Sequence, residues 1–136
     1  DYFCGRLFYH GHQGRFTAES YCNFLAEVLT RTEQPLILIH EGAKYHTAQQ
    51  PRAYCAGQAE RLTVYPLPSY APDYNPIEQL WKNVKHHKTH NRYFPTFDTL
   101  IAAVEAGLTH FQQHLDEAKQ LMGSYLDEMA GLTLPA

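Results

Sequence analysis

The sequence predicts a mixed α/β domain, and three features of its 136 residues support that fold class. Residues 36–39 form a continuous apolar run of strand length, which is typical of an internal parallel strand buried on both faces. A second short strand is expected at residues 62–65, just before a proline-rich loop. Elsewhere, apolar residues recur every three or four positions, as they do along one face of a helix. Helices that alternate with strands in this order predict the α/β class.

The chain is expected to open with a hairpin followed by a helix. Residues 2–9 are rich in aromatic side chains, residues 10–14 contain two turn glycines, and residues 15–17 follow as a short strand. The next apolar residues recur at helical spacing and predict a helix from about residue 18 to residue 31. They are Tyr21, Phe24, Leu25, Val28 and Leu29.

Two further helices are expected on either side of the second strand. The first covers residues 47–58, with Pro51 in or near its first turn. The second follows the proline-rich loop, with Asn75 as its N-cap and Pro76 at the first helical position. The apolar face of this second helix consists of Ile77, Leu80, Trp81 and Val84.

The last part of the chain carries a long apolar stripe at helical spacing. The stripe predicts either one long helix or two consecutive helices, with Gly107 or Gly123 as the possible break. Its members are Phe97, Leu100, Ile101, Val104, Leu108, Phe111, Leu115, Ala118, Met122, Tyr125 and Met129.

The composition is that of a soluble globular protein, with 44% hydrophobic and 18% charged residues. No apolar run approaches the ~18 residues of a membrane-spanning helix, and no secretory signal pattern opens the chain. The three cysteines Cys4, Cys22 and Cys55 are widely spaced, which indicates reduced thiols without a disulfide framework. The sequence therefore predicts a cytoplasmic protein in which these cysteines fill buried space.

Charge is distributed unevenly along the chain. The net charge of −3 argues against a protein that binds nucleic acid over its whole surface. Residues 82–92 nevertheless contain four cations, three histidines and no acid, so they predict a local phosphate-binding patch. The alternative is a solvated helix face that balances charge. The predicted DNA-binding residues are Lys82, Lys85, Lys88 and Arg92.

The histidines of the same stretch allow a second hypothesis. His86 and His90 are one helical turn apart and His87 lies between them, which is a spacing that can bind zinc. No matching second pair of ligands is evident in the sequence. A solvated basic helix end is therefore the favoured interpretation.

Two glutamates stand at the ends of predicted elements. Glu78 falls in the first turn of the helix after the proline-rich loop, where it can complete a capping box or bind a metal ion. Glu41 leaves the carboxyl end of the apolar strand, where α/β sheets generally place ligand sites. A solvated acid at the exit of the strand is the alternative for Glu41.

The stretch 66–85, which reads PLPSYAPDYNPIEQLWKNVK, resembles the PxYSPxLNPIExxWxxLK signature of DDE transposases. The similarity is to bacterial insertion-sequence enzymes related to the mariner superfamily. It implies an RNase H-like fold, which is a mixed sheet flanked by helices. It also implies that Glu78 is the last ligand of a metal-binding carboxylate triad, with Mg²⁺ or Mn²⁺ as cofactor and DNA as substrate.

A second family motif, DGAxxH or DNAxxH after an apolar strand, resembles the residues that follow the first predicted strand. Gly42, Ala43 and His46 match, whereas Glu41 occupies the position of the aspartate that is the family's second metal ligand. The 36 residues between Glu41 and Glu78 are close to the family's usual interval. Glutamate is one methylene longer than aspartate, and Mg²⁺ requires near-octahedral ligands at ~2.0–2.1 Å, so we expect this change to weaken activity.

The resemblance also implies that the first catalytic aspartate is missing. Residues 2–29 are similar to the part of the family that follows this aspartate, so Asp1 is not in position to be that ligand. We expect the first strand and the upstream DNA-binding region to be absent, which makes the chain a fragment. The incomplete sheet is then expected to pair with a second copy in a homodimer, or with the missing N-terminal segment.

These features predict a single partial DDE transposase catalytic domain over residues 1–136. Within it we expect a hairpin at residues 1–17, a core at residues 18–113 and a C-terminal helix at residues 114–136.

The predicted catalytic and metal-binding residues are Glu41 and Glu78, with His46 adjacent to the site. The family chemistry is metal-dependent cleavage and transfer of DNA strands during transposition, in the bacterial cytosol, and we expect the isolated chain to be inactive. The alternative is a non-catalytic remnant that binds DNA or a partner chain.

Overall fold

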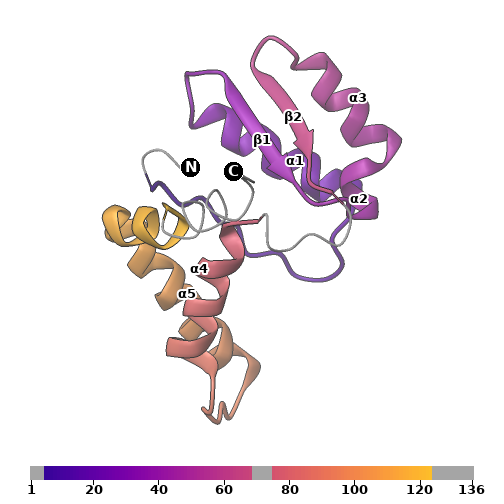
Figure 1. Ribbon diagram of the computed structural model, residues 1–136. Coiled ribbons are helices and arrows are strands. Elements are labelled where there is room, and N and C mark those ends of the chain that lie inside the picture. The colour runs from indigo at the N-terminus through magenta and orange to yellow at the C-terminus, as the bar shows by residue number, and fades with distance from the viewer. Residues whose placement is uncertain (1–4, 69–74, 124–136) are drawn as a thin grey trace. The chain divides into compact units, whose positions relative to one another are not determined.

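The chain divides into two compact units, each with its own core. The computed structural model describes residues 5–68 and 75–123 (Figure 1). The sheet unit spans His10–Ala71, and the helical unit combines Asp1–Tyr9 with Pro72–Ala136.

The sheet unit consists of two parallel strands and three helices, which confirms the mixed α/β class. Leu36 pairs with Leu62 and His40 pairs with Pro66, so the two strands run in register over their whole length (Figure 1). In chain order the elements are α1 (Ala18–Thr30), β1 (Leu36–His40), α2 (Lys44–Thr47), α3 (Gln49–Gly57) and β2 (Leu62–Pro66).

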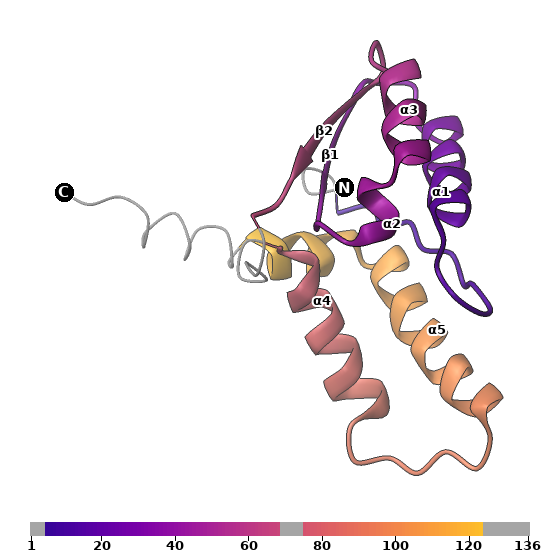
Figure 2. The ribbon, with the colours of Figure 1, turned by 90° about the vertical axis from the view of Figure 1, so that its right-hand side faces the viewer.

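Only one face of this sheet is covered within the sheet unit. Side chains alternate between the two faces of a strand, and α1 and α3 lie on the same side of the sheet in Figures 1 and 2. Leu62 is buried on that side, whereas Ile37 is 69% exposed and Ile39 is 60% exposed. The expectation of a strand buried on both faces is therefore wrong for β1. A single layer of helices can cover only every second side chain of the strand.

Side-chain hydrogen bonds define both ends of α1, which lies where the sequence predicts a helix. The Thr17 hydroxyl accepts from the Ser20 amide at 3.1 Å, and the Ser20 hydroxyl accepts from the Thr17 amide at 2.9 Å, which completes a capping box. At the other end, the Arg61 guanidinium donates to the carbonyl of Leu29 at 3.0 Å and to that of Thr32. These bonds satisfy carbonyls that a helix end leaves without partners.

After the proline-rich loop, the first helix of the helical unit is α4 (Ile77–Val84). Pro76 is the N-cap residue of α4 and no side-chain cap bond forms there, so the expected N-cap at Asn75 is shifted by one residue. The backbone closes this end instead, because the Glu78 amide donates to the Asn75 carbonyl at 3.0 Å.

A π-helical turn, η2 (Lys85–Thr89), extends α4 directly. It ends with a bond from the His90 amide to the Lys85 carbonyl at 2.7 Å. Asn91 then adopts φ 55°, the left-handed conformation that commonly terminates helices and that asparagine tolerates.

The second long helix, α5 (Phe97–Gln113), runs beside α4 and η2 (Figures 1 and 2). Leu80, Val84, Leu108, Phe111 and Ala118 form the buried cluster between them, and Ile77, Trp81 and Val104 pack against it. This confirms the apolar face predicted for α4.

The apolar stripe of α5 is buried only in part. Phe97 is 71% exposed and Ile101 is 39% exposed, so the expected core begins at Val104. The helix also ends at a residue that the sequence did not indicate. His114 has φ −119° and ψ 70°, and a further helix covers residues 115–123.

Gly107, the first of the two glycines expected as a possible break, does not interrupt α5. Gly107 is buried inside α5, where an added Cβ would lie 3.0 Å from side-chain carbons of both Val84 and Lys88. Gly123 is the last described residue of the final helix. The apolar positions Tyr125 and Met129, like Cys4, lie outside the described residues.

The expected opening hairpin does not form in residues 5–17, none of which is in a strand. Residues 5–9 instead run along α5. The Tyr9 hydroxyl and Thr109 Oγ1 are 3.2 Å apart, and the Gln112 amide donates to the Leu7 carbonyl at 3.2 Å. Gly5 permits this path because it has φ 71°, and a Cβ there would lie 2.2 Å from the Leu115 carbonyl oxygen. Residues 5–9 therefore pack against α5 instead of pairing as a strand.

Leu108 and Phe97 both belong to the apolar stripe, but only Leu108 is buried, so substituting each of them tests this core. Leu108→Ala removes a side chain that is 5% exposed and should lower the free energy of unfolding by about 2–5 kcal/mol. Phe97→Ala removes a larger side chain that is mostly exposed and should change it by no more than about 0.5 kcal/mol. Urea denaturation followed by circular dichroism measures both. A larger loss for Phe97→Ala than for Leu108→Ala would contradict this core.

Candidate functional site

Two imidazoles converge on the backbone of Glu41, which follows β1 directly. Nδ1 of His40 and Nδ1 of His46 each lie 2.7 Å from the Glu41 carbonyl oxygen. A carbonyl can only accept a hydrogen bond, so both rings donate through Nδ1–H. This assigns the proton of the neutral imidazole to Nδ1 in both residues. The Glu41 side chain itself is exposed.

Aromatic rings enclose His46 on two sides. The ring centroids of Tyr21 and Tyr45 lie 4.3 Å and 4.4 Å from that of His46, and the His40 centroid lies at 4.8 Å. Burial lowers the pKa of His46, and the hydrogen bond to the Glu41 carbonyl offsets part of that effect. The imidazole is therefore neutral at pH 7, next to the predicted site residue Glu41.

Tyr21 is a member of this cluster that the sequence did not single out. Its position on the apolar face of α1 predicts only core packing, and no short motif includes it. Burial is the main cause that raises the pKa of Tyr21 to about 12. Its hydroxyl oxygen is buried and has no hydrogen-bond partner among the described residues. Such a group carries an uncompensated loss of hydration.

Glu78 lies in the first turn of α4, as predicted, and is partly buried. The amino end of a helix carries a partial positive charge, which favours an ionised carboxylate there. Glu41 belongs to the sheet unit, whereas Glu78 belongs to the helical unit.

The four predicted DNA-binding cations fall into two groups. Lys82, Lys85 and Arg92 are exposed and form no ion pair within the described ranges. Lys88 is partly buried, because its aliphatic stem lies against the surface of α5 at Gly107. The first three cations are thus available to a phosphate backbone, whereas Lys88 lies at the packed interface of η2 with α5.

The described residues do not form a ready-made metal site. Residues 5–68 and 75–123 contain no group of three or more His, Cys, Asp or Glu side chains that could hold a metal ion. Within these two ranges, the donor side chains therefore do not by themselves make a site for a divalent ion. The same finding applies to the zinc hypothesis, in which His86 and His90 stack at 6.0 Å instead of converging on a point.

The described cysteines are free thiols. Cys22 is buried and Cys55 is partly buried, and burial raises the pKa of both thiols. A raised pKa keeps the unreactive thiol form at neutral pH. None of the described helices is both long and apolar enough to cross a membrane.

Because the buried hydroxyl of Tyr21 has no hydrogen-bond partner among the described residues, its removal should stabilise the protein. Tyr21→Phe removes the oxygen and keeps the ring, so it should raise the free energy of unfolding by about 1 kcal/mol. Tyr9→Phe is the matched control, because the Tyr9 hydroxyl lies 3.2 Å from Thr109 Oγ1 and its loss should lower stability by about 1 kcal/mol. Chemical denaturation measures both. A loss of stability in Tyr21→Phe would show that its hydroxyl has a partner.

Comparison with protein families yields one match. A family model described as DDE superfamily endonuclease matches residues 4–101, which is more than half of the chain and includes both Glu41 and Glu78. No curated protein and no solved structure matches the sequence. The family assignment agrees with the motif resemblance at residues 66–85 and implies an RNase H-like fold. The chain therefore belongs to the DDE superfamily endonucleases.

Proposed function

We propose that the chain is the catalytic-domain portion of a bacterial transposase, whose family chemistry is metal-dependent cleavage and transfer of DNA strands. The family generally uses divalent metal ions, and membership implies DNA as the substrate. The observation that supports the proposal best is the family match that includes both Glu41 and Glu78. Each of these glutamates also stands at the end of an element, after β1 and at the start of α4.

Glu41 and Glu78 are the residues that we propose as metal ligands, at the second and third positions of the family's carboxylate triad. We infer from the family resemblance that Asp1 does not stand at the first position, so that these 136 residues supply two carboxylates of the three. A hard divalent ion prefers about six or more oxygen ligands. Two carboxylates supply about two of these, so about four would have to come from water and the ion would be held less firmly. We therefore propose weak binding of Mg²⁺ or Mn²⁺ and no cleavage by this chain alone.

Plasmid cleavage tests this proposal directly. The purified chain, incubated with supercoiled plasmid in Mg²⁺ or Mn²⁺, should leave the plasmid supercoiled, because the carboxylate set is incomplete. Agarose gel electrophoresis separates supercoiled from nicked DNA. The control is Glu78→Gln, which replaces the carboxylate with an amide of the same size. Metal-dependent nicking that disappears in Glu78→Gln would overturn the proposed inactivity and show that Glu78 is catalytic.

The second candidate function is DNA binding without catalysis, in a remnant of the same family. Lys82, Lys85 and Arg92 favour it because they are exposed and unpaired in the described part of the chain. Binding through phosphates releases counterions, so its affinity falls steeply as salt rises.

Fluorescence anisotropy with a labelled duplex over a range of salt concentrations measures this dependence. The double variant Lys82→Gln/Lys85→Gln should weaken binding and reduce the slope of log K against log[salt] by about 2, roughly one for each lysine. The control is Arg52→Gln, which removes one exposed positive charge from α3 and should leave the slope unchanged. Binding with no salt dependence would argue against a phosphate-facing patch.

A partner chain is part of the same proposal. The parallel sheet of the sheet unit contains two strands, and Ile37 and Ile39 are mostly exposed on its uncovered face. Apolar surface and unpaired strand edges of this kind favour association. A homodimer would appear as a concentration-dependent increase in mass by analytical ultracentrifugation.

A further inference from the structure

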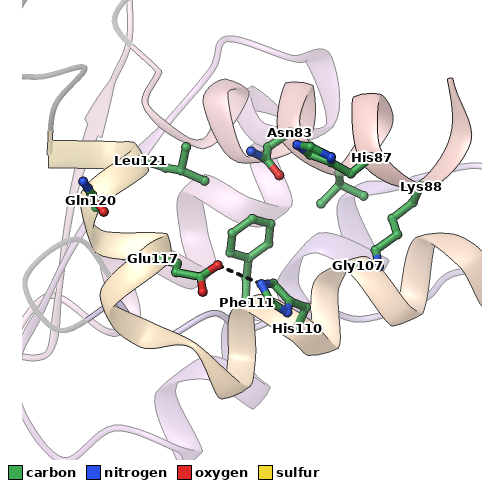
Figure 3. Close-up of a pocket in the computed structure, with 10 residues that line it drawn as sticks. Asn83, His87, Lys88, Gly107, His110, Phe111, Glu117, Gln120 and Leu121 are labelled. Atoms are coloured by element: carbon green, nitrogen blue, oxygen red, sulfur yellow. Dashed lines mark hydrogen bonds and ion pairs between the residues drawn. The ribbon is translucent and has the colours of Figure 1, made fainter.

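The helical unit contains a cavity that Glu78, the predicted catalytic residue of this unit, does not line. Its volume is about 610 Å³, within the range of roughly 300–1,000 Å³ that small-molecule sites occupy. The cavity opens between α4 with η2 on one side and α5 with the helix at residues 115–123 on the other (Figure 3). Neither Glu78 nor the exposed cations Lys82 and Lys85 line it.

The floor of this cavity is apolar. Phe111, Leu121 and Val84 contribute hydrocarbon surface, and Figure 3 shows the Phe111 ring and Leu121 pointing into the space. Gly107 adds no side chain on the α5 side of the cavity, where a Cβ would lie 3.0 Å from side-chain carbons of Val84 and Lys88. Phe111 and Val84 are core residues that are only 4% and 2% exposed, so the partly buried Leu121 supplies most of the apolar surface that a ligand could touch.

Polar groups with unused hydrogen-bonding capacity stand around the same floor. Asn83, His87 and Lys88 line the cavity, and their side chains make no hydrogen bond or ion pair to any residue that the structure describes. Two of them, His87 and Lys88, are on the π-helical turn η2, a conformation often found at functional sites. Figure 3 places Asn83 and His87 together above Phe111, with Lys88 farther along toward Gly107.

The one acid in the lining is already paired. Glu117 accepts a hydrogen bond from His110 Nε2 at 2.8 Å (Figure 3), and this bond lowers the pKa of the Glu117 carboxyl. Glu117 therefore stays ionised, and its carboxylate is held by His110. Lys88 remains the cation that is available to an anionic ligand in this cavity.

An apolar floor, a primary amide and an unpaired ammonium together match the parts of a nucleotide. The face of a base packs on apolar and aromatic side chains, an asparagine amide pairs with the edge of a base, and a lysine binds the phosphate. We propose that this cavity binds a single unstacked nucleotide of DNA, with its base against Leu121 beside the exposed edge of Phe111, its base edge at Asn83 and its phosphate at Lys88. The proposal rests on DNA as the family's substrate and adds a binding subsite that Glu78 does not line.

Asn83 supplies hydrogen bonds to the base edge. Its side-chain amide can donate to N7 and accept from the N6 amino group of adenine, and it can equally donate to O4 and accept from N3–H of an unpaired thymine. The cavity should therefore bind deoxyadenosine 5′-monophosphate (dAMP) and thymidine 5′-monophosphate (TMP) with similar affinity.

Titration of the ¹⁵N-labelled full chain with dAMP, followed by NMR, tests the subsite. The amide signals of Asn83 and Gly107 should shift and saturate, and inorganic phosphate or deoxyadenosine alone should bind more weakly than dAMP. Lys88→Gln keeps the stem that packs on α5 and removes the charge, so it should weaken dAMP about tenfold and leave deoxyadenosine unchanged. Asn83→Ala should weaken the binding of dAMP, TMP and deoxyadenosine alike, because it removes the hydrogen bonds to the base edge.

Lys119→Gln is the matched control, since Lys119 is an exposed lysine of the same unit outside the cavity lining, and it should bind dAMP like the unmodified chain. Shifts confined to other residues, or phosphate that binds as tightly as dAMP, would overturn the nucleotide site. If salt-dependent duplex binding through Lys82 and Lys85 persists while dAMP does not bind, the subsite fails and the DNA-binding function stands. If dAMP binds in the cavity while duplex and single-stranded DNA do not bind, the subsite stands and the proposed function fails.

Discussion

The parallel pairing of β1 with β2 is the constraint on which the sheet unit depends. Pairing in register from Leu36 to His40 brings the carboxyl ends of both strands to the same edge of the sheet. Glu41 leaves β1 at this edge, and its carbonyl is held there by His40 and His46. The hydrogen-bonded pairing of β1 with β2 thus determines where Glu41 leaves the sheet. The two imidazoles then restrict the backbone from which it projects.

Close helix packing has the corresponding role in the helical unit. The absence of a side chain at Gly107 lets Val84 and the stem of Lys88 contact the backbone of α5. The same contact separates Lys88 from the exposed cations of α4 and directs it along the cavity in Figure 3. A basic stretch that looks uniform in the sequence therefore has two parts. One part faces solvent and suits phosphates of a duplex, and the other part borders a site with an apolar floor.

The secondary structure of individual segments was the most predictable part of this protein. The spacing of apolar residues located α1 and the buried face of α4, and the apolar runs located both strands, because each pattern reflects the geometry of a single element. Predictions about packing between elements were less successful. Phe97 and Ile37 are apolar residues at suitable positions, yet both are exposed. Leu7 and Tyr9 pack on α5 although their composition favours a strand. Burial depends on which distant segment covers a residue, and the periodicity of one segment contains no information on that.

The sequence by itself determined the family, since the motifs at Glu41 and Glu78 consist of consecutive residues whose identities can be compared directly. It also determined the mixed α/β class and the order of the elements after the first helix. Only the tertiary structure decided that Tyr21 carries a buried hydroxyl without a partner in the described residues, and that Asn83, Lys88 and Phe111 line one cavity. The physical reason is distance along the chain. A motif is built from neighbours in sequence, whereas a cavity and a desolvated group arise where remote segments pack together.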